Sequence, residues 1–283
     1  MGLQWLNNYI PIKKIKMKVH IITGYSGPGG STIAFMRLTN ALNEKGIETF
    51  FIGPHDYHLD KCNGLKLNQE SVNKITKNDI VLTHFVKIDQ RIPCKKLIHV
   101  SHETYWFELY DLPEFYDEVV FLHEKHREFH EDYKGKYSLI PNLKENLDFK
   151  EKPELDLTAG IIGSIEDRKQ TSISIDRAIK DGCKKVYLFG HVTDTEYWQK
   201  SLIEWLVAFP EIVFLKGYYE DKQEMYDMIG RVYHSSKGEV ACLVKDECYL
   251  TGTKFFGNDQ TDHEVSTLTN DEIINLWENL FNE

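Results

Sequence analysis

Short apolar runs alternate with amphipathic stretches along the chain from Lys18 onward. The apolar runs are four or five residues long and rich in β-branched residues, as expected of buried strands. Between them, apolar residues recur every three or four positions, which is the period of a helix with one face on a core. This order is typical of βαβ units around a parallel sheet. In the first half it predicts strands at 19–23, 48–52, 79–83, 96–100, 118–122 and 137–140, and helices at 31–45 and 123–133.

A charged stretch containing Pro153, residues 144–156, interrupts this pattern and is predicted to link two tandem α/β lobes. After it, the pattern predicts strands at 158–162, 185–189 and 212–215, and helices at 172–181, 195–209 and 222–231. Residues 240–243 fit either a short strand or the start of a helix, and a last amphipathic helix begins behind Thr269 or Asn270. The predicted organisation is an extension at 1–16, a lobe at 17–150, a second lobe at 151–268 and a terminal helix at 269–283.

Composition narrows the class of protein. With 283 residues, 41% hydrophobic and 12% aromatic, the chain can build ordered cores, and its net charge of −10 disfavours non-specific binding to nucleic acid or anionic membranes. Its five cysteines form no C-x-x-C pair, which indicates reduced thiols and a cytoplasmic protein. No apolar run reaches the roughly 18 residues of a membrane span, and residues 1–16 lack the features of a signal peptide.

A glycine-rich loop with Gly24, Gly27, Gly29 and Gly30 follows the first predicted strand. Such a loop lets the backbone approach a phosphate, and the next helix offers free N–H groups to it. Gly24-x-x-Gly27-x-x-Gly30 also fits the fingerprint of NAD-dependent sugar-nucleotide epimerases, with Asp56 for the adenosine ribose and Tyr218-x-x-x-Lys222 as the catalytic pair. A tight turn without a ligand is a third interpretation.

Polar residues also follow other strands. His84 and the pair His102-Glu103 end predicted strands of the first lobe, where parallel sheets bind ligands, although each histidine is equally compatible with a structural cap. His123, His126 and His130 have the spacing of one helix face, but the charged residues around them favour a solvated face over a metal site.

The second lobe supplies further candidates. Gly163 and the cations Arg168-Lys169 follow its first strand and suit a diphosphate, and Tyr218 follows a later strand, where it is placed to stack on a nucleobase. Glu239 and Glu247 form a Glu-x7-Glu pair behind the polar segment 234–238.

Taken in order, these motifs resemble the retaining GT-B glycosyltransferases of the large family 4 type, which includes sucrose-phosphate synthases and bacterial cell-surface sugar transferases. The matching segments are 27–30, 79–84, 100–103, 139–142, 160–169 and 239–252. The resemblance implies two Rossmann-like lobes facing across a cleft. It also implies a cytoplasmic hexosyl- or pentosyltransferase that needs no metal or other cofactor and uses a UDP- or GDP-sugar.

By that resemblance, Glu247 binds the ribose, Glu239 lies by the donor sugar, and His102 and Glu103 face the donor sugar or the acceptor. Arg168 and Lys169 hold the diphosphate together with Gly163 and the N–H groups of Gly29 and Gly30. The departing phosphate takes the acceptor proton, so no protein nucleophile is needed, and replacing Glu247 or Arg168 by Ala is expected to abolish binding without unfolding.

Three features depart from the family pattern: Val240 follows the first glutamate in place of glycine, Lys254 replaces a proline, and Arg168 and Lys169 are adjacent where the family spaces its two cations. Compact enzymes of this type resemble those of bacteriophages, whose acceptors include surface glycans, small molecules and modified DNA bases, the last disfavoured here by the negative charge. The alternatives are an NAD-dependent epimerase or dehydratase and a non-catalytic glycan-binding protein.

Overall fold

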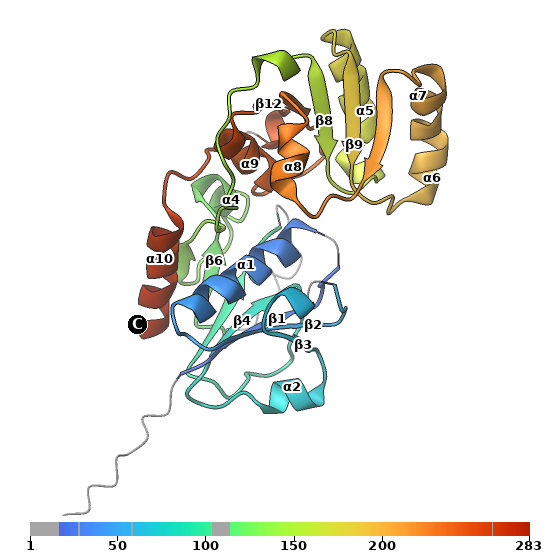
Figure 1. Ribbon diagram of the computed structural model, residues 1–283. Coiled ribbons are helices and arrows are strands. Elements are labelled where there is room, and N and C mark those ends of the chain that lie inside the picture. The colour runs from blue at the N-terminus through green and yellow to red at the C-terminus, as the bar shows by residue number, and fades with distance from the viewer. Residues whose placement is uncertain (1–16, 28, 58, 104–113, 262) are drawn as a thin grey trace, which may run out of the picture.

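The computed structural model describes residues 17–27, 29–57, 59–103, 114–261 and 263–283. Two parallel sheets, each covered by helices, form two lobes that face each other (Figure 1). The predicted extension at 1–16 lies outside the described residues. Among the helices of the described chain, none is both long and apolar enough to cross a membrane.

The N-terminal lobe is built on a seven-stranded sheet in the order β3-β2-β1-β4-β5-β6-β7. Its strands are β1 (Val19–Thr23), β2 (Thr49–Gly53), β3 (Gly64–Lys66), β4 (Ile80–His84), β5 (Lys96–Val100), β6 (Glu118–Phe121) and β7 (Tyr137–Leu139). Its helices are α1 (Gly30–Glu44), α2 (Gln69–Asn73) and α4 (Glu124–Glu128). The central strands β1, β4 and β5 are fully buried, which explains why their sequences are mostly apolar and do not alternate between apolar and polar residues.

The C-terminal lobe has a five-stranded sheet in the order β10-β9-β8-β11-β12. Its strands are β8 (Thr158–Ile162), β9 (Lys185–Phe189), β10 (Val213–Gly217), β11 (Arg231–Tyr233) and β12 (Lys254–Phe256). Its helices are α5 (Thr171–Lys180), α6 (Thr195–Tyr197), α7 (Ile203–Ala208), α8 (Lys222–Asp227) and α9 (Leu243–Thr251), with a π-helical segment at Trp198–Leu202 between α6 and α7.

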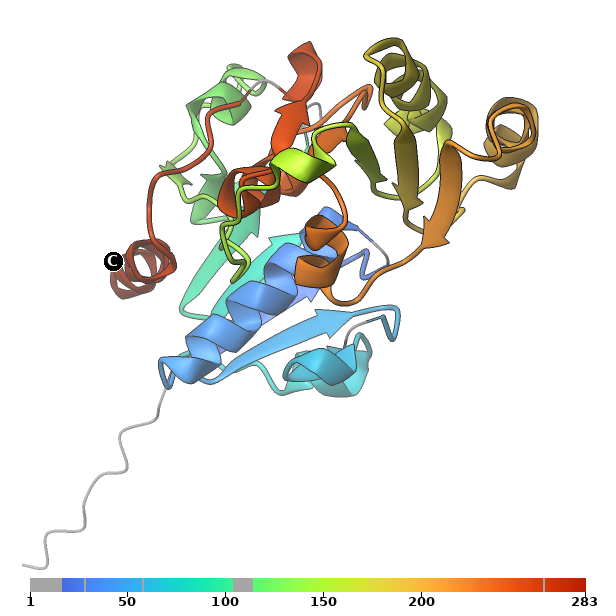
Figure 2. The same ribbon diagram turned by 45° about the horizontal axis from the view of Figure 1, so that its top comes forward.

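The chain crosses between the lobes twice. After the second lobe it returns to the first, where α10 (Asn270–Asn282) packs on the same core as α1 (Figures 1 and 2). Ile273, Trp277 and Phe281 of α10 are buried in the same core as α1 and the N-terminal sheet. Lys95 and Lys96 donate hydrogen bonds of 2.7 Å to carbonyl oxygens in the last turn of α10. The last segment of the sequence therefore completes the first lobe.

The structure differs from the sequence pattern in three places. The helix predicted at 123–133 is a single turn, and its histidines are not a solvated face, because His126 and His130 are buried. The helix predicted at 222–231 ends at Asp227, and Arg231 begins β11. The three-residue strands β3, β11 and β12 are absent from the prediction because they are too short to show a period. Residues 240–243 lead into helix α9.

Candidate functional site

A cavity of about 730 Å³ lies between the two lobes. Its walls come from residues that follow the carboxyl ends of strands in both sheets, which is where parallel α/β sheets bind ligands. Every residue that the resemblance to GT-B glycosyltransferases assigns to the site lines this cavity except Gly27. Gly27 is buried in the turn before α1, where its carbonyl oxygen accepts a 2.8 Å hydrogen bond from Thr32.

The amino end of α1 forms part of the first wall. Gly29, Gly30 and Ser31 line the cavity, and Gly29, which occupies the N-cap position, has no side chain to cap the helix. The first N–H groups of a helix have no partner within the helix, and its dipole is positive at this end. A Cβ on Gly30 would lie 3.5 Å from Cδ1 of Leu243 in the other lobe, so the wall is close to α9 here. The first turn of α1 therefore suits an anion that enters the cavity.

His102 lies between two rings of the first lobe. Its ring stacks on Phe35 with centroids 5.0 Å apart, and His84 lies edge-on at 5.3 Å. Burial, and secondly the neighbouring His84, hold the pKa of His102 well below its ordinary value. Burial likewise lowers the pKa of His84 to about 3. Both imidazoles are neutral at pH 7, so His102 presents one donor and one acceptor to a hydroxyl group.

Glu103 is held by the two buried histidines of α4 and the residues after it. The carbonyl oxygen of Glu103 lies 3.0 Å from Nε2 of His126 and 2.8 Å from Nε2 of His130. Burial raises the pKa of the Glu103 carboxyl group. The histidine cluster that resembles a metal site in the sequence thus fixes the backbone at the cavity wall. Within the described residues, no three or more His, Cys, Asp or Glu side chains are grouped to hold a metal ion.

The predicted cation pair follows β8 at the opposite wall. The turn is tight, because a Cβ on Gly190 would lie 1.9 Å from the carbonyl oxygen of Gly163. Arg168 is half-exposed and lies 3.0 Å from a carboxylate oxygen of Glu166. Lys169 is largely buried and forms an ion pair with Glu239. Both cations face the cavity, and each already shares its charge with a carboxylate.

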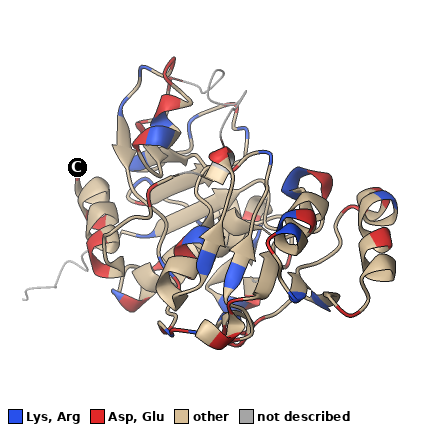
Figure 3. Ribbon diagram, turned by 90° about the horizontal axis from the view of Figure 1, so that it is seen from above, with Lys and Arg blue, Asp and Glu red and all other residues tan. Residues whose placement is uncertain are grey.

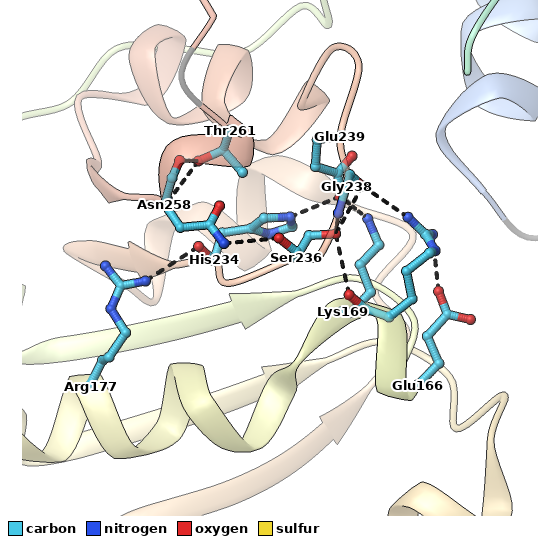
Figure 4. A network of polar contacts seen from close by, with 10 residues as sticks. Glu166, Lys169, Arg177, His234, Ser236, Gly238, Glu239, Asn258 and Thr261 are labelled. Carbon is cyan, nitrogen blue, oxygen red and sulfur yellow. Dashed lines mark hydrogen bonds and ion pairs between the residues drawn. The ribbon is translucent and has the colours of Figure 1, made fainter. Parts of the chain in front are cut away.

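Glu239 is fixed through one of its two oxygens. Oε1 pairs with Lys169 and lies 3.1 Å from Nε2 of His234 (Figure 4). Burial opposes ionisation, but Lys169 and His234 outweigh it and hold the pKa of Glu239 well below its ordinary value. Glu239 is therefore a carboxylate at any physiological pH.

Glu247 is buried in a network that joins the lobes. Its Oε1 pairs with Lys222 of α8 and lies 3.2 Å from Arg37 of α1, and its Oε2 accepts a 3.0 Å hydrogen bond from Tyr226. Arg37 also pairs with Glu145 in the connection between the lobes. Burial raises a carboxyl pKa, but Lys222 and Arg37 outweigh it and lower the pKa of Glu247. The carboxylate has three partners before any ligand arrives.

Tyr218 and His191 form an aromatic pair at the ends of β10 and β9. Their rings are stacked with centroids 4.9 Å apart and an interplanar angle of 13°. Both line the cavity, together with Tyr25 and Tyr57 of the other lobe. Flat apolar surface of this kind suits a nucleobase.

Sequence reasoning did not assign His191, Lys222 and His234, which line the cavity, to a donor site, nor Arg37, which contacts Glu247 behind the cavity wall. Arg37 and Lys222 look like ordinary solvated cations of helices, and His191 follows a strand in the same way as Tyr218. His234 belongs to the polar segment before Glu239, and this position in the sequence was the one signal that could have assigned it to the site. In contrast, Asp56 is exposed and pairs with Lys66 at 2.9 Å, outside the cavity.

No family model and no curated protein matches this sequence. Solved structures match over most of the chain. HepE of Anabaena, solved in complex with UDP, has a TM-score of 0.67 and 14% identity, with 94% of this chain and 90% of that chain covered. Sucrose-phosphate synthase of Thermosynechococcus elongatus has a TM-score of 0.65 and 14% identity, with 85% and 81% covered. WaaG, a glycosyltransferase involved in lipopolysaccharide biosynthesis, has a TM-score of 0.62 and 12% identity, with 94% and 90% covered.

At this level of identity the likeness concerns the arrangement of the chain in space. The chain forms two parallel α/β lobes with a cleft between the carboxyl ends of their strands. Its last helix returns to the first lobe. The chain therefore has the GT-B fold, two Rossmann-like lobes facing across a cleft.

Proposed function

We propose that this protein is a cytoplasmic, metal-independent retaining glycosyltransferase that takes its sugar from a UDP- or GDP-sugar. One observation carries the proposal: groups from both lobes meet in one cavity. The first lobe supplies the amino end of α1, and the second supplies the cations Arg168 and Lys169 and the ionised glutamates Glu239 and Glu247. A nucleoside diphosphate sugar has the matching parts, namely an aromatic base, a ribose, two phosphates and a polyhydroxylated ring. HepE, with the same fold, has been solved with UDP and with UDP-glucose.

Each part of the donor has a proposed partner. The base lies against Tyr218 and His191, and the ribose hydroxyl groups reach Glu247. The diphosphate lies between the first turn of α1 and the turn with Gly163, Arg168 and Lys169. The sugar lies between Glu239 and His102, next to Glu103.

In the proposed reaction, the bond between the anomeric carbon and the β-phosphate oxygen breaks, and the electron pair leaves with the diphosphate. The acceptor oxygen bonds to the anomeric carbon on the same face, and its proton passes to the departing phosphate oxygen. Arg168, Lys169 and the N–H groups at Gly29 and Gly30 stabilise the charge that develops on that oxygen. Positive groups of the chain thus supply what a metal ion supplies in other transferases, and retention follows from the same-face attack.

The acceptor is proposed to be a glycan or a small molecule. Positions of Lys and Arg are interspersed with positions of Asp and Glu along the ribbon of both lobes (Figure 3), and the net charge is −10. A DNA acceptor would need a stretch of positive surface to neutralise phosphates. A modified DNA base is therefore a less favoured acceptor. The five cysteines are free thiols, which suits the cytoplasm.

Thermal-shift and calorimetric titrations with UDP-sugars, GDP-sugars and NAD test the proposal. We expect a nucleotide-sugar to raise the midpoint of unfolding, since a ligand at about 100 times its Kd adds about 2.7 kcal/mol of stability. Arg168→Ala should weaken binding about tenfold or more. The free protein should be nearly as stable as the wild type, because Arg168 is half-exposed, and both its ion pair with Glu166 and its 3.3 Å hydrogen bond to Gly238 are exposed and contribute little. Arg91→Ala is the matched control, because Arg91 forms a similar exposed pair with Asp117 outside the cavity.

Nucleotide release and the anomeric configuration of the product complete the test. Release of UDP or GDP with a retained anomer supports the proposal. Binding without release indicates a glycan-binding protein, and a tightly held NAD indicates an epimerase or dehydratase. Absence of a shift with every nucleotide-sugar overturns the donor site.

A further inference from the structure

His234 is the buried histidine that follows β11 and faces the cavity. Its backbone is held at two points: its N–H donates to the carbonyl oxygen of Phe256 in β12 at 3.0 Å, and its carbonyl oxygen accepts from Arg177 at 3.4 Å. Arg177 also donates to the hydroxyl oxygen of Ser235 at 2.9 Å. The ring is thus carried on a rigid strand end and not on a loop that adjusts freely. From there, Nε2 reaches Oε1 of Glu239 at 3.1 Å.

The bond to Glu239 defines the role of the ring. An ionised carboxylate only accepts hydrogen bonds, so Nε2 of His234 carries a hydrogen and donates. Lys169 pairs with the same oxygen. Among the described residues, no hydrogen bond or ion pair is formed with the second oxygen, Oε2. Two donors on Oε1 leave Oε2 as the oxygen available to a ligand in the cavity.

The segment between the two residues is fixed as well (Figure 4). Asn258 donates to the carbonyl oxygen of Ser236 at 2.9 Å, and the N–H of Lys237 donates to the carbonyl oxygen of Arg168 at 2.9 Å. Arg168 in turn donates to the carbonyl oxygen of Gly238 at 3.3 Å. This segment therefore ties Glu239 to the predicted diphosphate turn, and the ring of His234 is what sets the direction of the carboxylate.

We propose that His234 is a positioning residue, whose Nε2–H fixes Glu239 so that Oε2 receives a hydroxyl group of the donor sugar. This inference rests on the proposed function and extends it to the recognition of the sugar. Lys169 alone does not supply this control, because an ammonium group is a point charge without a preferred direction toward one oxygen. The imidazole N–H lies in a ring plane held by the end of β11, so it selects one orientation of the carboxylate. His234 is therefore expected to affect binding and reaction of the sugar part of the donor, and not binding of the nucleotide part.

Substitution of His234 tests this role through the difference between nucleotide and nucleotide-sugar. His234→Phe keeps an aromatic ring but removes the donor, whereas His234→Gln keeps an N–H at the place of Nε2. We expect the Phe variant to bind UDP within about twofold of the wild-type protein, and to lose about tenfold or more in kcat/KM for hydrolysis of UDP-glucose, since hydrogen bonds to charged groups are among the stronger ones. The Gln variant should recover most of this loss. If the wild-type protein prefers a GDP-sugar, GDP and that sugar replace the UDP pair.

A double-mutant cycle with Glu239→Gln shows whether the histidine acts through the carboxylate. We expect His234→Phe to change kcat/KM little when Glu239 is already Gln, because coupled residues are not additive. If the Phe variant fails to fold, judged by its unfolding midpoint, His234→Leu replaces it.

The outcomes separate this inference from the proposed function. Additive effects of the two substitutions, an equal loss for UDP and UDP-glucose, or a Phe variant that equals the wild-type protein would each overturn the positioning role while leaving the transferase intact. A wild-type protein that binds no nucleotide-sugar removes the proposed function, and the role of His234 falls with it.

Discussion

For Glu247, the sequence and the structure predict different effects of substitution. In the sequence it is one of 44 acidic residues, and it is expected to be replaceable by Ala without unfolding. In the structure it is buried and holds Lys222, Arg37 and Tyr226. Removing one partner of a buried ion pair leaves charges without compensation, which costs several kcal/mol. The Ala variant would therefore confound binding with folding, and Gln is the better substitution.

The stability of the Glu247→Gln variant is expected to depend on pH differently from that of the wild-type protein. The pKa of Glu247 is lowered in the folded state, so the ionised group stabilises the fold above its ordinary value of 4.5. That stability is lost as the pH falls through the lower folded pKa. We expect the Gln variant to be about 3 kcal/mol less stable at pH 7, with the difference shrinking below about pH 4.5.

Urea unfolding of both proteins between about pH 7 and about pH 3 measures this difference. Glu220→Gln is the control, because Glu220 is largely exposed and pairs with Lys61 at 3.1 Å on the surface. A difference that stays constant over the whole pH range would contradict the buried ion pair.

At the scale of elements, α1 shows which parts of the site follow from local sequence. Glycines before an amphipathic helix predict an anion-binding amino end, and Gly29 and Gly30 do reach the cavity. The same pattern does not distinguish Gly27, whose carbonyl oxygen is bonded within the turn before α1, from Gly29 and Gly30, which line the cavity. The short strands β11 and β12 were missed because three residues show no period, and with them the rigid position of His234 was missed.

Two glycine substitutions at opposite ends of α1 are expected to separate binding from stability. Gly30→Ala adds a methyl group to the cavity wall at ordinary contact distance from Leu243, so the fold should persist while nucleotide affinity falls. Gly46→Ala, beyond the other end, meets open space but forces φ of 79° on a residue with a Cβ, so it should cost about 1 kcal/mol of stability without changing affinity.

Calorimetric affinity for UDP or GDP and urea unfolding, measured on both variants, test this pair. Equal affinity losses in the two variants would show that α1 affects the cavity through its stability and not through its first turn.

At the scale of the whole molecule, α10 ties the end of the sequence to the first lobe. Trp277 is buried against the core of the N-terminal sheet, while Trp205 packs on the core of the second lobe. Replacing a buried Trp such as Trp277 by Ala typically costs about 3–5 kcal/mol, and replacing the partly buried Trp205 should cost less. Because the two cores are separate, each loss should stay in its own lobe.

Hydrogen exchange followed by mass spectrometry is expected to show this separation. Trp277→Ala should speed exchange in β1, β4 and β5, although these strands are more than 170 positions away in the sequence. Trp205→Ala should speed exchange in β8 and β9 instead. Faster exchange in the second lobe of the Trp277 variant would mean that the lobes unfold as one unit.

The sequence by itself determined the alternation of strands and helices, and with it two α/β lobes whose strand ends carry the polar residues. These properties depend on neighbours within about four positions, so they leave a period or a motif in the chain. Only the tertiary structure decided that α10 belongs to the first lobe, that the histidines after β6 hold Glu103, and that Arg37 and Lys222 meet Glu247. These contacts join residues that are far apart in the sequence, and their side chains keep the local pattern of an ordinary solvated helix. The pairing of His234 with Glu239 lies between the two cases: its residues are neighbours in the sequence, but its geometry exists only because β11 and β12 hold the strand end in place.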